Sequence, residues 1–361
     1  MNTPHSKKFL RKVAPGQLNT PQSYIAYAAG KSGGHIVPCL TLAREYKAAH
    51  PTAHTLFFTA DGALDHTIIS QSSDVDQHIP LALENLPRSI WSWPVYACRL
   101  IGAWWNSLNI LSQYRPTAII TTGGIIAMPV CCAAYILRIP VHLYPLDAVP
   151  GKAIYALSKI ATKIYSCFDT IPQALPNNTV EHVAYPIRYS AQELSQTPHA
   201  ARLILGLDPD RLTIAVLGGS QGSVFINQIM GQWIQKYAHL KDKIQIIHQL
   251  GNNNIDEWHR LYSQHAIRAH VFGYKPNLAD VYAAADIIIA RAGAGTIFEA
   301  EAFGKPTLLI PLEASTTDHQ IDNAQAITKK YPHLFTMMRQ PIIEKDPDLF
   351  HVTLASMLDC T

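Results

Sequence analysis

Three glycine-rich segments of this chain have the composition of phosphate-binding turns. They are AGKSGGH at 29–35, TGG at 122–124 and LGGSQG at 217–222, and the first and third each follow a short apolar run and precede a helical pattern. Glycine allows a sharp turn, and the N-terminus of the helix that follows presents unpaired N–H groups to an anion. We therefore predict two nucleotide-binding halves that face each other across a cleft, as in an enzyme that acts on a phosphorylated donor.

Neither of the two best-known phosphate-binding motifs fits these turns. Gly30-Lys31-Ser32 matches the end of a P-loop, but Ile25 stands where that motif requires its first glycine. The run GGSQG at 218–222 lacks the G-x-G-x-x-G spacing of a dinucleotide-binding turn. For this run, phosphate binding and a tight structural turn both remain open.

Two further residues could act on a substrate. His35 opens the first helix, where the positive end of the helix dipole favours the neutral imidazole of a general base, and a structural role is the alternative. Glu299 ends the run RAGAGTIFE at 291–299, where its carboxylate could accept hydrogen bonds from both hydroxyls of a ribose. A capping box with Thr296 is the alternative for Glu299. The acid-x-acid triplets, such as DVD at 74–76, do not end a strong strand, so we assign no metal.

The elements that must position these residues alternate between strand and helix. Short apolar runs predict ten strands, at 24–29, 54–59, 118–122, 140–144, 163–167, 213–218, 244–249, 269–272, 286–290 and 307–311. This alternation is typical of α/β proteins with parallel sheets, whose ligands bind beyond the carboxyl ends of the strands. Because the proline-containing stretch 184–210 separates two halves, we expect an extension at 1–23, one domain at 24–187 and a second at 188–361.

The composition limits the classes of protein. With 361 residues, of which 48% are apolar and 15% charged, the chain has enough material for two hydrophobic cores. A net charge of only +3 argues against a nucleic-acid-binding protein. The six cysteines contain no C-x-x-C pair, which is typical of a reduced, cytosolic protein. The basic first 23 residues lack the apolar centre of a secretion signal, and we expect them to be disordered.

The segment 90–111 contains four of the six tryptophans, with other apolar residues at helical spacing and arginines within or beside it. No stretch of the chain has 18 uninterrupted apolar residues, so we do not expect a spanning helix. A helix of this composition could rest on an anionic membrane surface. A core helix with a wide apolar face is the alternative.

Five motifs follow one another along the chain. They are GxSGGHxxP at 30–38, GGxxAxP at 123–129, GGSQG at 218–222, RxGAxTxxE at 291–299 and HQxxNA at 319–324. In this order they resemble the MurG family, the peripheral-membrane glycosyltransferases that make lipid II, and the likeness spans about residues 24 to 340. The resemblance implies a GT-B fold of two Rossmann-like parallel-sheet domains. It also implies a place at the cytoplasmic face of the bacterial inner membrane.

The activity that the resemblance implies is an inverting, metal-independent transfer of N-acetylglucosamine. The donor would be UDP-N-acetylglucosamine and the acceptor the muramoyl 4-hydroxyl of undecaprenyl-linked lipid I, without any cofactor, and the product would be lipid II for peptidoglycan. The C-terminal half would bind the donor, with Ser220 at the diphosphate, the backbone around Lys275 at the uracil and Glu299 at the ribose. The remaining donor-binding residues would be Ala294, Gly295, Thr296, Ile297, Phe298 and Gln320.

The N-terminal half would bind the lipid-linked acceptor. Its diphosphate would be held by Ser32, Gly33 and Gly34. His35 would be the base that accepts the hydroxyl proton, with Asp147 as the second candidate, and Arg188 would face the junction of the two halves.

The resemblance also gives the tryptophan-rich helix a role. In the family, the corresponding helix forms an apolar patch ringed by basic residues that docks on the membrane. Arg99, Ile101 and Trp104 match this region, so we expect them to face an anionic phospholipid surface. The partners would then include the cell-wall and division machinery.

The chain departs from the family pattern at two positions near the acceptor. Lys31 replaces a usual glycine, and YPLD at 144–147 replaces a usual His-Glu-Gln-Asn, so Asp147 is a carboxylate where the family has an amide. Two enzymes of the same fold remain alternatives, a UDP-N-acetylglucosamine 2-epimerase and a diacylglycerol glycosyltransferase. A non-catalytic binding protein with two α/β lobes is a third.

Overall fold

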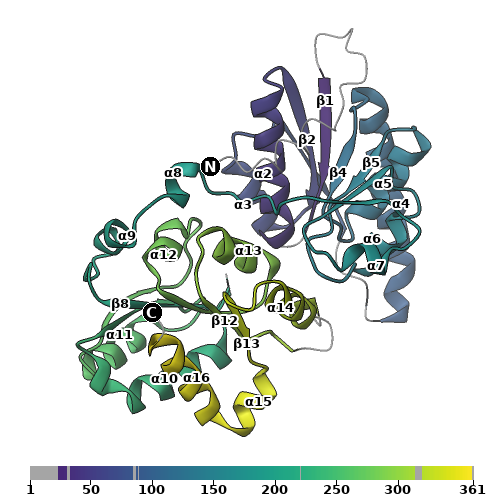
Figure 1. The fold of residues 1–361 in the computed structure, drawn as a ribbon. Helices are drawn as coiled ribbons and strands as arrows, with labels where there is room; N and C mark the ends of the chain where they lie inside the picture. Colours follow the sequence, from purple (N-terminus) through teal and green to yellow (C-terminus); the bar gives the residue numbers. More distant parts are fainter. Residues whose placement is uncertain are drawn as a thin grey trace. The chain divides into compact units, whose positions relative to one another are not determined.

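The computed structural model describes residues 23–30, 33–83, 87, 89–219, 221–313 and 319–359. The chain divides into two compact units, Met1–Arg188 and Tyr189–Thr361, and each unit has its own sheet (Figure 1). Both sheets are parallel and alternate with helices along the chain, which confirms the predicted α/β class with two Rossmann-like domains. The predicted N-terminal extension lies outside the described residues, apart from Ser23.

The first unit holds a seven-stranded sheet with the order β3-β2-β1-β4-β5-β6-β7, in which all neighbours are parallel. Its strands are β1 (Ser23–Ala28), β2 (Ala53–Ala60), β3 (Gln77–Leu81), β4 (Ile119–Thr121), β5 (Val141–Leu143), β6 (Lys163–Ser166) and β7 (Val180–His182). Its helices are α2 (Gly33–Ala49), α3 (Ala63–Ser70), the short η1 (Ile90–Ser92), α4 (Trp93–Tyr114), α5 (Ala127–Ile136), α6 (Lys152–Leu157) and α7 (Ile171–Ala174). Since the strands are parallel, their carboxyl ends share one edge, where the first two glycine-rich turns lie.

The central strands of this sheet are covered on both faces. Residues 25–28 of β1 and 55–60 of β2 are all buried, without the alternation of buried and exposed positions that a one-sided sheet shows. Tyr27 and Phe57, on neighbouring strands, stack with ring centroids 4.9 Å apart. The apolar runs of the sequence therefore form the centre of the sheet.

Helix α4 packs against α5 with one part of its circumference only. Its buried residues are Tyr96, Ala103, Ser107 and Leu111. It ends at Arg115, which has a φ of 45° and donates its N–H to the carbonyl of Leu111. None of the helices in the described part of the chain combines the length and the apolar character that crossing a bilayer requires.

The second unit holds a six-stranded parallel sheet with the order β10-β9-β8-β11-β12-β13. Its strands are β8 (Leu212–Leu217), β9 (Ile244–Gln249), β10 (Arg268–Phe272), β11 (Ile287–Ala290), β12 (Thr307–Leu309) and β13 (Phe335–Met337). Its helices are α8 (Ala191–Leu194), α9 (Pro198–Ile204), α10 (Val224–Lys236), η2 (Ala238–Leu240), α11 (Ile255–Gln264), α12 (Ala279–Ala284), α13 (Ala294–Ala302), α14 (His319–Lys330), α15 (Gln340–Lys345) and α16 (Pro347–Asp359). The core of this unit contains the fully buried Trp233 and Phe350.

All ten predicted strands are present, and three further strands, β3, β7 and β13, were not predicted. Each of these three lies at an end of its sheet. An edge strand has one neighbour and needs less apolar surface than a central one, so QHIPL and VEH lack a clear apolar run.

A buried histidine links three elements of the second unit. His248, on β9, is fully buried; its Nδ1 lies 2.8 Å from Tyr262 Oη on α11 and its Nε2 lies 3.1 Å from Asn227 Oδ1 on α10. The Trp258 ring packs edge-on against the imidazole at 4.6 Å. Burial lowers the pKa of His248 to about 3, because the charged form would lose its hydration.

We predict that this histidine makes the second unit sensitive to acid. Since the folded pKa lies below the unfolded value of about 6.5, the native state binds fewer protons, and stability falls as the pH drops below 6.5. The slope is about 1.4 kcal/mol per pH unit, or about 2 kcal/mol between pH 6.5 and 5. Urea unfolding of H248Q, which keeps polar partners for Asn227 and Tyr262, should show a smaller loss over this range. H259Q, at an exposed position, is the control and should behave as the wild type.

Candidate functional site

Two glycine-rich turns are in contact at the carboxyl edge of the first sheet. A Cβ atom at Gly30 would lie 2.6 Å from Cγ1 of the fully buried Ile126, so a side chain does not fit there. Gly123 and Gly124 have φ values of 98° and 84°, which favour glycine. The turn after β1 is thereby held against the turn after β4, beside the start of α2.

His35 lies in the first turn of α2 and contacts the residue that follows β4. Its Nδ1 is 3.3 Å from Oγ1 of Thr122, and the same hydroxyl lies 3.3 Å from the His35 carbonyl oxygen. Cys39, one turn further along α2, donates its thiol to this hydroxyl at 3.7 Å. Burial raises the pKa of the Cys39 thiol to about 12, so it stays protonated. The sequence motifs give Thr122 no role of its own, although its place directly before Gly123 could have indicated one.

The other predicted acceptor-side residues lie near this edge in different elements. Gly33 and Gly34 form the first turn of α2, and Gly34 is exposed, whereas Ser32 lies outside the described residues. Asp147 is half-buried in the loop after β5. This loop is tied to the sheet because the N–H of Tyr144 donates to a β4 carbonyl at 2.7 Å.

Arg188 is the last residue of the first unit and is half-buried. Its carbonyl oxygen accepts a hydrogen bond of 2.8 Å from Nη2 of Arg44, on α2. The backbone of Arg188 is therefore fixed to the helix that begins with the glycine-rich turn.

The carboxyl edge of the second sheet is built from glycines in backbone contact. Cβ atoms at Gly222 and Gly251, which have φ values of 77° and 65°, would approach the carbonyls of Leu250 and Gln221 closer than the 3.0 Å that real Cβ atoms keep. A Cβ at Gly273 would lie 2.9 Å from the Gly251 oxygen. The turns after β8, β9 and β10 therefore touch without side chains between them. Ser220, the predicted diphosphate ligand in the first of these turns, lies outside the described residues.

Helix α13 begins directly beyond β11 and has a glycine as its N-cap. No side chain of the described residues caps it at Gly293, so the first N–H groups, of Ala294, Gly295 and Thr296, are available to a ligand. Ile297 and Phe298 are buried and could contact a ligand through their backbone only. Since the cap is Gly293, the capping-box alternative for Glu299 is wrong.

Glu299 is buried in the helix and has a tyrosine partner that the sequence does not indicate. The hydroxyl of Tyr189, the first residue of the second unit, donates to Glu299 Oε2 at 3.2 Å. The Tyr189 ring packs edge-on against Tyr282 and Phe303, at 6.1 and 5.3 Å between centroids. The aromatic cluster therefore fixes the hydroxyl that holds this carboxylate.

Gln320, at the start of α14, connects two loops of this edge. Its Oε1 accepts hydrogen bonds from the N–H groups of Ala292 at 3.2 Å and Leu312 at 2.9 Å. Because two N–H groups donate to this atom, it is the amide oxygen of Gln320. The Nε2 group of the same amide can then donate to a ligand. The predicted role of Gln320 at the sugar therefore requires its amide nitrogen.

Arg291 is half-buried and lies three residues before the start of α13. Its Nε donates to Ser223 Oγ, and its Nη1 donates to the carbonyls of Ile310 and Pro311, each at 3.1 Å. Both Nη atoms lie 3.3 Å from Gln340 Oε1. Burial lowers the pKa of Arg291. One side chain thus ties together the segments after β8, β11 and β12.

Lys275, predicted near the uracil, has its ammonium group paired within the unit. Its Nζ lies 3.3 Å from Oδ2 of Asp280, and Gln196 donates to the other oxygen of that carboxylate at 3.2 Å. We therefore expect the uracil to contact the backbone of Lys275 rather than its ammonium group.

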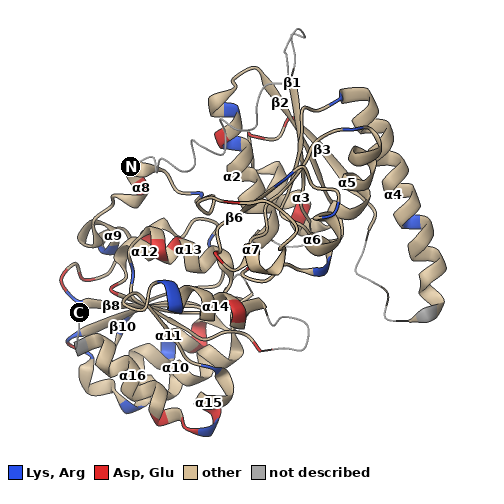
Figure 2. Cartoon of the chain, turned by 45° about the vertical axis from the view of Figure 1, so that its right-hand side comes forward, with Lys and Arg blue, Asp and Glu red and all other residues tan. Residues whose placement is uncertain are grey.

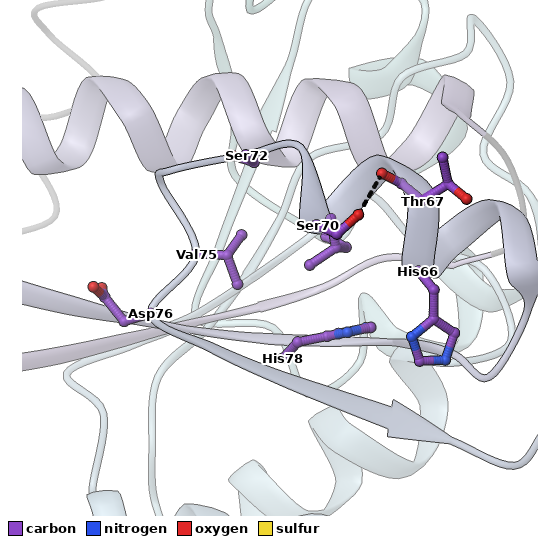
Figure 3. Close-up of a pocket in the computed structure, with 8 residues that line it drawn as sticks. His66, Thr67, Ser70, Ser72, Val75, Asp76 and His78 are labelled. Atoms are coloured by element: carbon purple, nitrogen blue, oxygen red, sulfur yellow. Dashed lines mark hydrogen bonds between the residues drawn. The ribbon is translucent and has the colours of Figure 1, made fainter.

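A pocket of about 520 Å³ lies elsewhere, along α3 and the edge strand β3 (Figure 3). The polar residues that line it include Asp76, whose carboxylate accepts hydrogen bonds from Lys47 Nζ and the Thr55 N–H, and His78, whose Nε2 lies 2.8 Å from Thr59 Oγ1. None of its lining residues belongs to a glycine-rich motif. In the described part of the chain, no cluster of three or more His, Cys, Asp or Glu side chains could hold a metal ion.

Comparison with protein families assigns both units. Residues 25–166 match the glycosyltransferase family 28 N-terminal domain, and residues 213–338 match the glycosyltransferase family 28 C-terminal domain. A curated relative from Christiangramia forsetii is 30% identical over 306 residues, which cover 84% of this chain and 82% of the relative. It is named UDP-N-acetylglucosamine–N-acetylmuramyl-(pentapeptide) pyrophosphoryl-undecaprenol N-acetylglucosamine transferase. A relative of the same name from Myxococcus xanthus is 26% identical over 314 residues, with 84% and 77% covered.

Solved structures share the fold at lower sequence identity. MurG from Acinetobacter baumannii has a TM-score of 0.72 at 21% identity, covering 94% of this chain and 91% of that one. The glycosyltransferase of kitacinnamycin has a TM-score of 0.65 at 15% identity, with the same coverage. A UDP-N-acetylglucosamine 2-epimerase has a TM-score of 0.57 at 12% identity, covering 91% and 89%. At these identities the likeness concerns the fold.

We predict that the glycine contact after β8 is required for stability. G222A places a Cβ against the Leu250 carbonyl and strains a positive φ. In G219A, also at positive φ, the added Cβ would have no atom of the described residues within 4 Å, its chain neighbours aside. The backbone strain should cost about 1–2 kcal/mol in both variants. The steric clash should add about 1–3 kcal/mol in G222A alone. Equal unfolding free energies for the two variants, measured with urea, would contradict this.

Proposed function

This chain belongs to the MurG family of glycosyltransferase family 28, and from that membership we propose that it transfers N-acetylglucosamine from UDP-N-acetylglucosamine to the muramoyl sugar of undecaprenyl-pyrophosphoryl lipid I. The chain is a glycosyltransferase of the GT-B fold. The product would be lipid II, the precursor of peptidoglycan. Lipid I is the N-acetylmuramyl-(pentapeptide) pyrophosphoryl-undecaprenol of the relatives' names.

The start of α13 carries the donor half of this proposal. The N–H groups of residues 294–296 have the geometry of an anion site, and we assign them, with the turn at 218–222, to the pyrophosphate of UDP. Glu299 lies one turn further along the helix and is oriented by Tyr189, which supports its assignment to the ribose hydroxyls. The amide nitrogen of Gln320 would donate to the sugar.

The acceptor half of the proposal rests on the start of α2. Its first residues, Gly33 and Gly34, would hold the pyrophosphate of lipid I, together with Ser32. His35, in the same turn, would be the base, with Asp147 as the second candidate and Arg188 as a further ligand of the acceptor.

We propose an inverting reaction without a metal. The muramoyl 4-hydroxyl oxygen attacks the anomeric carbon, the bond to the UDP oxygen breaks, and the base takes the hydroxyl proton. UDP leaves with the bonding electron pair. The N–H groups at the start of α13 would stabilise that charge, and one such preorganised donor is typically worth about 100- to 1000-fold in rate.

A transfer assay tests the proposal. We expect labelled N-acetylglucosamine to move from UDP-N-acetylglucosamine to a short-chain lipid I analogue, also in the presence of EDTA. E299Q should raise the KM for the donor at least about tenfold, because a hydrogen bond to a charged group contributes about 1.5–3 kcal/mol. E301Q is the matched control, because two residues along a helix correspond to about 200° of rotation.

Two outcomes would contradict the proposal. One is the absence of transfer to the lipid I analogue in the presence of folded protein. The other is the formation of UDP-N-acetylmannosamine without any acceptor, which would identify a 2-epimerase. An equal effect of E299Q and E301Q on the KM would reject the role of Glu299.

We also propose that α4 rests on an anionic membrane surface. Ile101 and Trp105 share one side of the helix and are 64% and 58% exposed. The helix has one charged residue, the exposed Arg99, and Figure 2 shows it almost uncharged along its length. Trp104 is half-buried, so the structure favours Trp105 as the larger apolar contact. Aromatic and apolar side chains at this exposure fit the boundary between headgroups and acyl chains.

Vesicle flotation tests the role of α4. The double variant I101S/W105S should bind phosphatidylglycerol vesicles at least about tenfold more weakly, because burying each side chain contributes about 1.5–3 kcal/mol. I342S removes a 46% exposed apolar side chain from the second unit and is the control. Equal flotation of the double variant and the control would reject this surface as the membrane contact.

A further inference from the structure

The hydroxyl of Thr122 has more potential partners than one proton can serve. The Thr122 residue is 1% exposed, and its Oγ1 lies 3.3 Å from His35 Nδ1, 3.3 Å from the His35 carbonyl oxygen and 3.7 Å from Cys39 Sγ. A threonine hydroxyl donates one hydrogen bond and accepts two. The carbonyl oxygen can only accept, and the protonated thiol of Cys39 acts here as a donor.

Only one arrangement of protons satisfies all three contacts. The hydroxyl donates to the His35 carbonyl and accepts from the Cys39 thiol, so its remaining lone pair needs a donor on the imidazole. That donor is a proton on Nδ1 of His35. In the other tautomer, the hydroxyl proton would turn to Nδ1, and the contact with the carbonyl would be lost.

We propose that Thr122 is a positioning residue that keeps the neutral His35 imidazole in the tautomer with its proton on Nδ1. The Nε2 atom then carries the lone pair. The tautomer follows from the contacts of Thr122, whereas the role of His35 in proton transfer rests on the proposed function. It identifies Nε2 as the nitrogen that takes the proton from the acceptor hydroxyl.

The position of Thr122 is fixed independently of His35. The preceding residue, Thr121, donates its hydroxyl to the Ala28 carbonyl of β1 at 2.6 Å and accepts the N–H of Gly123 at 3.0 Å. The end of β4 is thereby tied to β1 on one side and to the glycine turn on the other. A hydroxyl held this firmly can orient an imidazole, as the partners of catalytic histidines do in other enzymes.

Nuclear magnetic resonance of histidine nitrogens tests this directly. The full chain, labelled with ¹⁵N-histidine, should show His35 with a protonated Nδ1 and an unprotonated Nε2, the resonance being assigned by its absence from H35Q. T122S keeps the hydroxyl and should keep this tautomer. T122V removes it and should move the proton toward Nε2, the form that free imidazole side chains favour.

Kinetics separate the positioning role from a structural one. T122V should lower the kcat of transfer by about 10- to 100-fold, part of what a general base contributes, while the KM for UDP-N-acetylglucosamine changes less than about twofold. T122S should stay close to the wild type in both. A merely structural role would instead change thermal stability without changing the His35 tautomer.

The outcomes are distinguishable. A proton on Nε2 of His35 in the wild type would overturn the inference. The Nδ1–H tautomer retained in a folded T122V would overturn it as well. If T122V does not fold, the wild-type and T122S spectra decide the question. The expected spectra together with unchanged kcat in H35Q would support the tautomer and overturn the role of His35 as base in the proposed function.

Discussion

Backbone contact at glycines is the constraint on which the second unit depends. The turns after β8 and β9 lie so close at Gly222 and Gly251 that a single methyl group on either would overlap a carbonyl. Such contact is possible only without side chains, and it brings the N–H groups of one turn beside the next loop. Arg291 then ties the first of these turns to the segment after β12. The loops of this edge therefore form one connected surface rather than separate mobile connections.

The central strands of each sheet could be predicted, because a strand that is buried on both faces has a continuous apolar run in the sequence. Runs such as Leu212–Leu217 and Ile287–Ala290 are apolar without alternation, as strands covered on both faces must be. The edge strands β3 and β7 could not be predicted, because QHIPL and VEH lack a clear apolar run, and β13 could not, because it has only three residues. The edge strand β10 was predicted, because RAHVF ends in apolar residues. The helix boundary at Gly293 was also not evident, because Thr296 and Glu299 have the spacing of a capping box without forming one.

The chemical types at the candidate site could be predicted, but their partners could not. Glycine turns, a histidine and a glutamate stand out by composition and order. Their orientation depends on side chains far away in the sequence: Tyr189 is 110 positions from Glu299, and Thr122 is 87 positions from His35. No local sequence pattern predicts such pairs, since nothing around the tyrosine or the threonine distinguishes it from others. The fold alone brings each one close to its partner. Recognising them requires the order of the strands.

In the function proposed here, the helix starts of the two units have different chemical roles. At the start of α13, Ala294 is buried and Gly295 and Thr296 are half-buried. These residues offer N–H groups and no ionisable side chain. At the start of α2, the corresponding turn contains His35, a group that can take up a proton. A turn with N–H groups alone can stabilise negative charge but cannot remove a proton, whereas one with an imidazole can do so. Glycosyl transfer needs both, because a leaving diphosphate gains charge while an attacking hydroxyl loses a proton. We propose that the division of these roles between the two units follows from which side chain occupies the first turn.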